Sequence, residues 1–305
     1  MATVSVFSRT FRVKFKSSSA HFIRGIASSS RLHSHTRSLK EFSMANKVAA
    51  VTGGARGLGN MFCRAFIEAG CNSIAIIDLH EQEAETAAKA LIHEYETAGA
   101  VQRGELNVIG VGCDVASEKS VQSAFGQLQS RIGRVNALVT AAGIVENFPA
   151  TEYPTPKIQK LFDINVHGSF FCAREVAKSL LGHGESGSII LISSMSANIV
   201  NQPQLQTPYN ASKAAVKHMA SSLAVEWAKS GIRVNALSPG YMMTKLTEKV
   251  LEENPKLKES WHTLTPMGRM GIPEELKGAI VFLASDASSY VTGSEIRVDG
   301  GYCCV

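Results

Sequence analysis

Short apolar runs and longer amphipathic stretches alternate along residues 47–298 of the chain. A short apolar run bounded by turn residues predicts a buried strand, and apolar positions at helical spacing predict a helix. The predicted strands cover residues 47–52, 73–78, 106–113, 135–141, 188–194, 232–237 and 295–298. The predicted helices cover residues 58–69, 81–98, 117–131, 156–181, 209–229 and 273–284.

Strands that are apolar throughout and alternate with helices predict a parallel sheet that is covered on both faces. Right-handed crossovers then give an α/β fold with a doubly wound parallel sheet of the Rossmann type, in a single domain. Residues 241–271 lie outside the alternation, after the sixth strand, and include Trp261 and His262. We interpret this insertion as a lid over a substrate site.

The positive charge of the chain is concentrated at its N-terminus. The 305 residues carry 31 Lys and Arg against 26 Asp and Glu, a net charge of +5. Residues 1–40 hold eight of these bases, ten serines and no acid, which leaves 23 bases against 26 acids in the remainder. A nucleic-acid-binding protein needs a basic face on its folded part, so no nucleic-acid partner is expected.

The composition of this tail is typical of a mitochondrial transit peptide, which is rich in Arg and Ser and poor in acids. We therefore expect residues 1–43 to be a disordered presequence for import into the mitochondrial matrix, and residues 44–305 to form the folded domain. The alternative is a basic arm on a cytoplasmic protein. No apolar stretch approaches the roughly 18–20 residues that span a bilayer, so no membrane association is expected.

A metal site and a disulfide scaffold are not expected. The six cysteines form no C-x-x-C motif and no metal-ligand spacing. His93, His167, His218 and His262 are spread over different segments without paired spacing, so we assign them to packing or to the surface.

A glycine-rich turn joins the first predicted strand to the first helix, with Gly53, Gly57 and Gly59 around Arg56 and Leu58. Such a turn lets the backbone approach a pyrophosphate, whose charge then lies at the positive end of the helix. Asp78 ends the second strand 19 residues beyond Gly59, where an acid can accept hydrogen bonds from the adenosine ribose. A carboxylate there repels the 2′-phosphate of NADP, whereas Arg56 would attract it. We expect NAD as the cofactor, with NADP as the alternative.

Tyr209 and Lys213 lie four residues apart on one predicted helix and therefore share a face. Pro208 suits the first helical position and Thr207 can cap the helix, which places Tyr209 in the first turn. A free phenol has a pKa of about 10, and a nearby ammonium lowers it toward the range of a general base. Ser194 ends the fifth strand, where its hydroxyl can polarise a substrate carbonyl.

Taken together, these motifs resemble the short-chain dehydrogenase/reductase family over residues 46–302. The matching positions are Thr52, Gly53, Gly57, Gly59, Asp114, Val115, Asn165, Ser194, Tyr209, Lys213, Ser238, Pro239, Gly240, Thr244, Val298, Asp299, Gly300 and Gly301. The resemblance implies an NAD(P)-dependent enzyme that transfers a hydride between the cofactor and a secondary alcohol or ketone. A catalytically inactive dinucleotide-binding sensor is the alternative from another class, and it predicts the loss of Ser, Tyr or Lys from this set.

The resemblance also implies a role for each residue. Tyr209 exchanges a proton with the substrate, Ser194 holds the substrate oxygen, Lys213 binds the nicotinamide ribose, and Asn165 positions a water in a proton relay. Asp114 meets the adenine, while Gly240 and Thr244 border the nicotinamide amide. The residues expected to bind the cofactor are Gly53, Arg56, Gly57, Leu58, Gly59, Asp78, Asp114, Val115, Ala142, Gly143, Tyr209, Lys213, Gly240 and Thr244.

The chain departs from the family pattern at two places. Residues 140–143 read Thr-Ala-Ala-Gly instead of Asn-Asn-Ala-Gly, which keeps the glycine and loses an asparagine that stabilises the sheet in relatives. The family usually has its serine 13 residues before the tyrosine, the position of Ser196, whereas Ser194 lies 15 before Tyr209. We prefer Ser194 because it directly ends the apolar strand, and Ser196 is the alternative.

The substrate class is indicated by polar residues and by further resemblance. Five amide side chains follow Ser194, and amides suit the hydroxyls of a polyol; these are Asn198, Asn201, Gln202, Gln204 and Gln206. Residues 199–203, 266–269 and 299–302 are similar to fungal-type sugar and polyol dehydrogenases that act on arabinitol, mannitol, sorbose or xylulose. A mitochondrial 3-oxoacyl-(acyl carrier) reductase is the alternative enzyme. The resemblance also implies a homodimer or homotetramer formed through helices 156–181 and 209–229.

Overall fold

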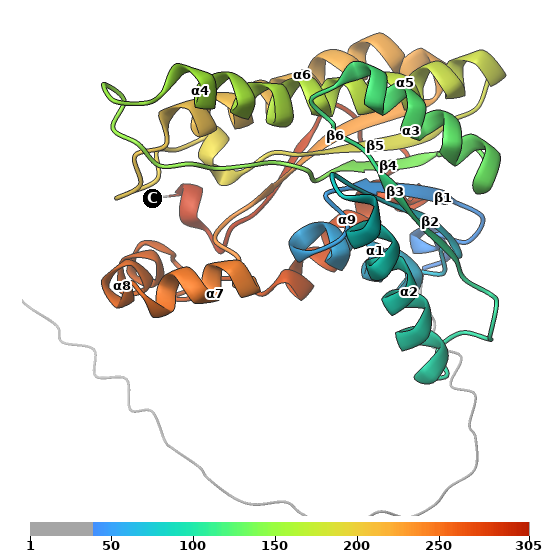
Figure 1. Ribbon diagram of the computed structural model, residues 1–305, viewed down its shortest axis with the longest axis horizontal. Coiled ribbons are helices and arrows are strands. Elements are labelled where there is room, and N and C mark those ends of the chain that lie inside the picture. The colour runs from blue at the N-terminus through green and yellow to red at the C-terminus, as the bar shows by residue number, and fades with distance from the viewer. Residues whose placement is uncertain (1–38, 305) are drawn as a thin grey trace, which may run out of the picture. The chain divides into compact units, whose positions relative to one another are not determined.

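The computed structural model describes residues 39–304 (Figure 1). The expected presequence therefore lies almost entirely outside the described residues. Within them, one parallel sheet has the strand order β3-β2-β1-β4-β5-β6-β7. The strands are β1 (Val48–Thr52), β2 (Ser73–Asp78), β3 (Asn107–Gly112), β4 (Ala137–Thr140), β5 (Gly187–Ile192), β6 (Ile232–Pro239) and β7 (Glu295–Val298).

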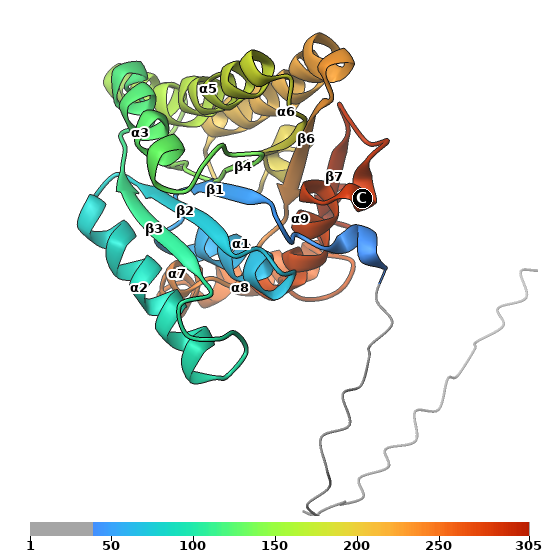
Figure 2. The same ribbon diagram turned by 90° about the vertical axis from the view of Figure 1, so that its right-hand side faces the viewer.

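Helices cover both faces of this sheet. The α-helices are α1 (Gly57–Glu68), α2 (Glu81–Thr97), α3 (Glu118–Arg131), α4 (Thr155–Phe162), α5 (Gly168–His183), α6 (Thr207–Trp227), α7 (Lys245–Glu252), α8 (Pro255–Leu264) and α9 (Lys277–Ala284). Figure 2 shows α1, α2 and α9 on one face and α3, α5 and α6 on the other. Each face has its own buried apolar cluster against the sheet, and the two-sided cover explains why the strands are apolar throughout.

Short helical turns complete the secondary structure. They are η1 (Lys40–Phe42), η2 (Asp163–His167), η3 (Met195–Ala197), η4 (Ala228–Ser230), η5 (Pro273–Leu276), η6 (Asp286–Ser288) and η7 (Tyr302–Cys304). Turn η2 is π-helical, whereas the others are 3-10 turns.

The sequence-based elements are confirmed in order and type, with two differences. The helix predicted over residues 156–181 is interrupted by η2, so that it forms the two segments α4 and α5. The excursion over residues 241–271 contains helices α7 and α8, which the strand–helix alternation did not predict. Its two ends are joined by a short parallel bridge between Met242 and Gly271.

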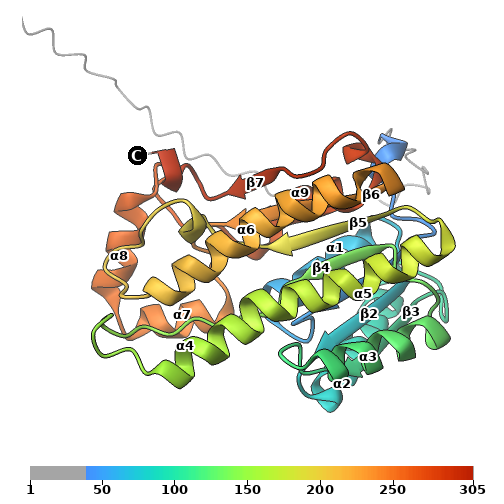
Figure 3. The ribbon, with the colours of Figure 1, turned by 90° about the horizontal axis from the view of Figure 1, so that it is seen from above.

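Because all strands are parallel, their carboxyl ends meet at one edge of the sheet. Figure 3 shows α4, α7 and α8 beyond this edge. Strands β1 and β4 are neighbours. Helix α1, which follows β1, and helix α5, which comes after β4 and α4, cover opposite faces of the sheet. This is the switch point at which open α/β sheets bind their ligands.

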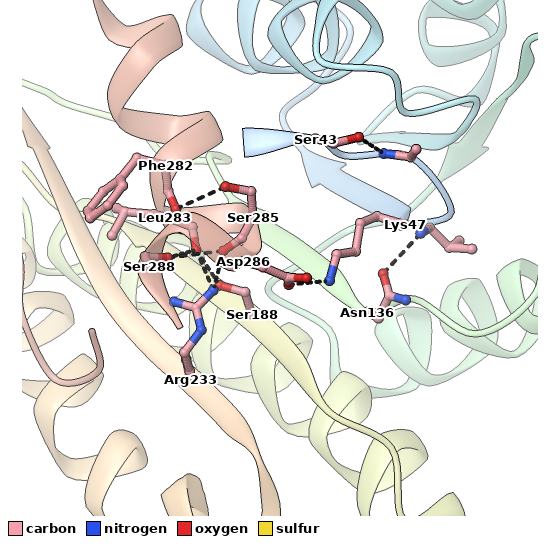
Figure 4. A network of polar contacts seen from close by, with 12 residues as sticks. Ser43, Lys47, Asn136, Ser188, Arg233, Phe282, Leu283, Ser285, Asp286 and Ser288 are labelled. Carbon is pink, nitrogen blue, oxygen red and sulfur yellow. Dashed lines mark hydrogen bonds and ion pairs between the residues drawn. The ribbon is translucent and has the colours of Figure 1, made fainter. Parts of the chain in front are cut away.

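The opposite, amino edge of the sheet is fixed by buried polar contacts (Figure 4). The Arg233 guanidinium donates to the carbonyl oxygens of Leu283 at 2.9 Å and Ser285 at 3.0 Å. It also donates to the Val291 carbonyl at 3.1 Å. The Ser188 hydroxyl donates to the same Leu283 oxygen at 2.7 Å. These bonds satisfy the carboxyl end of α9 and join it to β5 and β6.

The folded body begins slightly before the expected boundary at residues 43 and 44. The Phe42 ring lies 6.2 Å from the ring of Phe282, and the Met44 side chain is fully buried. No helix within residues 39–304 is both long and apolar enough to cross a membrane.

Candidate active site

The turn between β1 and α1 has the shape that a pyrophosphate requires. Gly53 and Gly57 have positive φ angles of 64° and 56°, and α1 begins at Gly57 without a side-chain cap. A Cβ on Gly59 would lie 2.1 Å from the Gly53 carbonyl oxygen, so only glycine fits there. A Cβ on Gly57 would meet nothing within 4 Å. The turn therefore offers uncapped amides and open space at the positive end of a helix, which fits a dinucleotide.

The same turn packs against the end of β4. A Cβ on Gly53 would lie 2.9 Å from the Cα of Ala142, and the Ala142 amide donates to the Thr52 hydroxyl at 3.1 Å. Thr140, at the position of the family's asparagine, is buried, and its hydroxyl has no partner among the described residues. The asparagine's contribution to the sheet is thus not replaced by a contact of this threonine.

Asp78 closes the turn from the second strand. Its carboxylate accepts the Ala55 amide at 3.0 Å and the Leu79 amide at 2.9 Å, which holds the glycine turn against the end of β2. Arg56 points to solvent and forms an ion pair with Glu83 at 3.4 Å. Glu83 lines an open cavity of 870 Å³ beside Ala55 and Leu79, and no sequence motif indicated its contact with Arg56.

Asp114 and Val115 follow β3 and have different surroundings. The Asp114 carboxylate is exposed and accepts the Ala116 amide at 3.0 Å. Val115 is buried, and a Cβ on Gly168 would lie 2.9 Å from its Cγ2 atom. Val115 therefore packs against the first residue of α5.

Asn165 lies in the π-helical turn and is fully buried. Its amide oxygen accepts the Ile144 amide at 2.9 Å, and its amide nitrogen donates to the Ile144 carbonyl at 3.0 Å and to the Ser212 hydroxyl at 3.1 Å. A Cβ on Gly143 would lie 3.2 Å from the Asn165 amide oxygen and 3.5 Å from the Lys213 ammonium. The π turn thus places Asn165 beside the loop after β4 and near Lys213, and its described side-chain contacts hold that loop.

Tyr209 and Ser194 are brought together by α6 and the end of β5. Helix α6 begins at Thr207 with Gln206 at the cap position, so Thr207 is not the cap that the sequence predicted. Tyr209 still lies in the first turn. Burial raises the pKa of the Tyr209 phenol, and the neighbouring Ser194 hydroxyl opposes that rise. The sequence-based expectation of a lowered pKa is therefore wrong for this structure. The pKa of Tyr209 is raised, because the effect of burial outweighs that of the neighbouring groups.

Lys213 lies one turn further along α6 and is buried. Its ammonium donates to the Ile192 carbonyl at 2.9 Å and lies 5.8 Å from the centre of the Tyr209 ring. Burial lowers the pKa of Lys213 to about 8. The ammonium is thus held between the end of β5 and the tyrosine ring, and it joins the two elements that carry the hydroxyls.

Ser194 and Ser196 have different neighbours in the structure. Ser194 lies two residues beyond the end of β5 at Ile192, and its hydroxyl lies beside Tyr209. Ser196 lies in η3, and its hydroxyl donates to the Asn201 amide oxygen at 2.6 Å.

The amides that indicated a polyol site are in part bonded to one another. Asn201 and Gln206 are buried, and Gln206 donates to the Asn201 oxygen at 3.0 Å. Tyr241 donates to Gln204 at 3.1 Å. Composition showed a polar loop, but only the structure shows that these three amides bind protein groups.

Gly240 and Thr244 lie at the start of the 241–271 excursion. A Cβ on Gly240 would lie 2.6 Å from the Asp299 Cα, so glycine is required where β6 passes the end of β7. Thr244 caps α7, and its hydroxyl accepts the Thr247 amide at 3.2 Å. Behind them the Tyr241 and Trp261 rings are stacked 3.8 Å apart, which packs the base of the excursion.

Comparison with known proteins gives one family and a consistent set of relatives. Residues 53–303 match the family described as enoyl-(acyl carrier protein) reductase. The chain is 40% identical over 280 residues to a D-arabinitol 2-dehydrogenase (ribulose-forming) of Candida tropicalis, which covers 90% of this chain and 99% of that protein. It is 38% identical over 264 residues to an NADH-dependent L-xylulose reductase of Ambrosiozyma monospora, covering 86% and 96%.

Solved structures share the architecture. A gluconate 5-dehydrogenase from Burkholderia cenocepacia J2315, in complex with NADP and tartrate, superposes with a TM-score of 0.79. It is 32% identical, and the match covers 87% of this chain and 98% of that one.

Proposed function

The chain belongs to the short-chain dehydrogenase/reductase family, and we propose that this nicotinamide-dependent oxidoreductase interconverts a secondary alcohol of a sugar alcohol and the corresponding ketose. The observation that carries the proposal is the convergence of Ser194, Tyr209 and Lys213 at the carboxyl edge of the sheet, at the end that also carries the glycine turn. The named relatives supply the substrate class, with D-arabinitol and ribulose or xylulose as the first candidates.

Each side chain has a distinct task in this proposal. Bound nicotinamide supplies or accepts the hydride at the substrate carbon. Tyr209 takes the proton of the substrate hydroxyl during oxidation and returns it during reduction. Ser194 donates a hydrogen bond to the substrate oxygen, which fixes that oxygen within reach of Tyr209.

Lys213 acts on Tyr209 and on the cofactor. Its ammonium lies close enough to the phenol ring to favour the phenolate, and it would bind the nicotinamide ribose. Asn165 would complete the set by ordering the loop after β4, and a water at this loop would connect Lys213 to solvent. The backbone at Gly240 and Thr244 would border the nicotinamide.

NAD is the proposed cofactor. Asp78 lies against the glycine turn, where its carboxylate would bind the ribose hydroxyls and repel a 2′-phosphate. The Arg56–Glu83 ion pair supports this preference, because Glu83 competes for the guanidinium that would attract the phosphate. The relative that uses NADH supports NAD, whereas the solved neighbour with bound NADP keeps NADP as the alternative.

A steady-state screen tests both parts of the proposal. The chain from residue 39 would be assayed with D-arabinitol, xylulose, ribulose, mannitol, sorbose and an acetoacetyl thioester, each with NAD(H) and NADP(H). We expect turnover of at least one polyol and ketose pair, with higher kcat/KM for NAD(H). Turnover of the thioester alone would instead identify a 3-oxoacyl reductase.

We further propose that residues 241–271 form a lid over the substrate. The two helices α7 and α8 lie beyond the carboxyl edge, and their base is packed by the Tyr241–Trp261 stack. Protection of α7 from hydrogen exchange in the presence of cofactor and substrate would support the lid. Unchanged exchange across α7 and α8 would count against it.

The assembly is proposed to be a homodimer or homotetramer through α5 and α6. Leu181 on α5 and Val225 on α6 expose apolar side chains, with Val225 84% exposed. Light scattering on a sizing column should give at least twice the mass of one subunit. A mass of one subunit would reject the interface.

Residues 1–43 are proposed to direct the chain into mitochondria, because they combine eight bases with ten serines and no acid among the first 40. A fluorescent reporter fused behind these residues should enter mitochondria. A reporter that stays in the cytoplasm would favour the cytoplasmic alternative.

A further inference from the structure

A continuous series of buried polar contacts runs from Ser194 to the base of the 241–271 excursion. The Ser194 hydroxyl donates to the Ser196 hydroxyl at 3.0 Å, which donates to the Asn201 amide oxygen at 2.6 Å. The Asn201 amide nitrogen donates to the Tyr241 hydroxyl at 3.1 Å. Ser194, Ser196 and Asn201 are each more than nine-tenths buried. Water therefore has little access to these groups, and the orientation of each hydrogen matters.

The orientation of Asn201 is fixed by its neighbours. Gln206 donates to the Asn201 oxygen at 3.0 Å and to the Asn210 oxygen at 2.9 Å, so both hydrogens of its amide nitrogen are engaged. The Asn201 oxygen thus faces two donors, Gln206 and Ser196, and its nitrogen faces the Tyr241 hydroxyl. Exchanging the oxygen and nitrogen of Asn201 would turn a donor toward Gln206.

This orientation sets the direction of the hydroxyl contacts. A carbonyl oxygen only accepts, so the single hydrogen of Ser196 is directed to Asn201. The Ser196 oxygen is then left as an acceptor, and it receives the hydrogen of Ser194. The Ser194 oxygen also accepts the Ser196 amide at 3.1 Å. Ser196 therefore holds Ser194 through both its backbone and its side chain.

We propose that Ser196 and Asn201 are positioning residues for Ser194. Asn201 directs the hydrogen of the Ser196 hydroxyl. Ser196 in turn fixes the position of the Ser194 oxygen, and its own oxygen accepts the Ser194 hydrogen while no substrate is bound. When a substrate oxygen is bound, the Ser194 hydrogen turns to it about a Cβ–Oγ bond whose oxygen is already in place. The inference rests on the proposed role of Ser194 and adds to it that the role depends on two residues that need not touch the substrate.

The first test compares Ser196→Ala with Ser196→Thr, which keeps the hydroxyl. Ser196→Ala should lower kcat about tenfold, because misplacement of a reacting group reduces the rate more than it reduces binding. The affinity for NADH, measured by fluorescence titration, should stay within twofold, and Ser196→Thr should restore at least half of kcat. Asn201→Leu, of similar size, should reproduce the loss in kcat by a second route.

Leu205→Ala is the control from the same loop. The apolar side chain of Leu205 is 56% exposed and takes no part in the polar contacts between Ser194 and Tyr241. Its substitution should leave kcat within twofold. If Ser196→Ala and Asn201→Leu also leave kcat within twofold, the positioning inference is wrong.

A double-mutant cycle separates positioning from general loss of structure. In a Ser194→Ala background, Ser196→Ala should cause no further loss of kcat, because its effect passes through the absent hydroxyl. A full tenfold loss in that background would show that Ser196 acts by another route and would overturn the inference. If Ser194→Ala alone keeps turnover, the proposed function of Ser194 fails. If Ser194→Ala removes turnover but Ser196→Ala does not, only the positioning inference fails.

Discussion

At the scale of single residues, the proposed role of Lys213 requires a buried ammonium that lowers the stability of the fold. The spacing of Tyr209 and Lys213 placed both side chains on one face of a helix. Only the packing of α6 against β5 shows that the amine is buried, with its pKa lowered to about 8. A buried cation costs folding free energy that an apolar side chain of similar length would not cost.

Lys213→Met should therefore be inactive and more stable than the wild-type chain at pH 7, by roughly 1 to 3 kcal/mol. The unfolded chain keeps the ordinary Lys pKa, so the cost of burial is fully present below pH 8. It disappears as the pH rises from about 8 to the unfolded value near 10.5. Denaturant unfolding at pH 7 and pH 10 should show the difference shrinking. A difference that grows with pH would contradict the assigned burial.

A second residue-scale prediction concerns the contact between Arg56 and Glu83. Glu83→Gln should free the Arg56 guanidinium for a 2′-phosphate and raise kcat/KM for NADP roughly two- to fivefold, the range of an exposed ion pair. The kcat/KM for NAD should change little.

Glu85→Gln is the control for this change. Glu85 lies on the same helix and pairs with Lys89 at 3.7 Å, so its removal changes the charge of α2 without touching Arg56. An equal gain for NADP in Glu85→Gln would assign the effect to net charge.

At the scale of elements, two glycines differ in whether their position requires glycine. Gly59→Ala should weaken NADH binding by more than tenfold and destabilise the fold by about 2 to 4 kcal/mol, since its Cβ would meet the Gly53 oxygen at 2.1 Å. Fluorescence titration and denaturant unfolding would measure the two effects.

Gly126→Ala is the opposite case within one molecule. Gly126 is exposed in the interior of α3, and a Cβ there would meet nothing within 4 Å. Alanine should stabilise the chain by roughly 0.5 to 1 kcal/mol and leave cofactor binding unchanged. Similar effects of both substitutions would mean that the close approach in the glycine turn is not the cause.

At the scale of the whole molecule, the folded body starts before the end of the basic tail. A chain that begins at residue 39 should keep full stability and activity. A chain that begins at residue 46 loses the ring of Phe42 and the buried Met44, and should be less stable by about 2 to 4 kcal/mol. Thermal unfolding of the two chains measures the difference in stability. Equal unfolding midpoints would show that residues 39–45 do not contribute to the stability of the fold.

The sequence by itself determined the class of fold and singled out the candidate reacting groups. Apolar strands alternating with amphipathic helices allow few topologies besides a doubly wound parallel sheet, and parallel strands bring their carboxyl ends to one edge. Gly53, Gly57, Gly59, Asp78, Tyr209 and Lys213 could be singled out because each lies at a strand end or at a fixed helical spacing.

Only the tertiary structure decided what depends on contacts between distant segments. The π turn at Asn165, the burial that raises the pKa of Tyr209, and the contact of Glu83 with Arg56 have no signature in local periodicity. The amides after Ser194 show the reason most directly. Their composition is that of a polar loop, but whether an amide faces substrate or another side chain depends on how that loop packs against α6 and Tyr241.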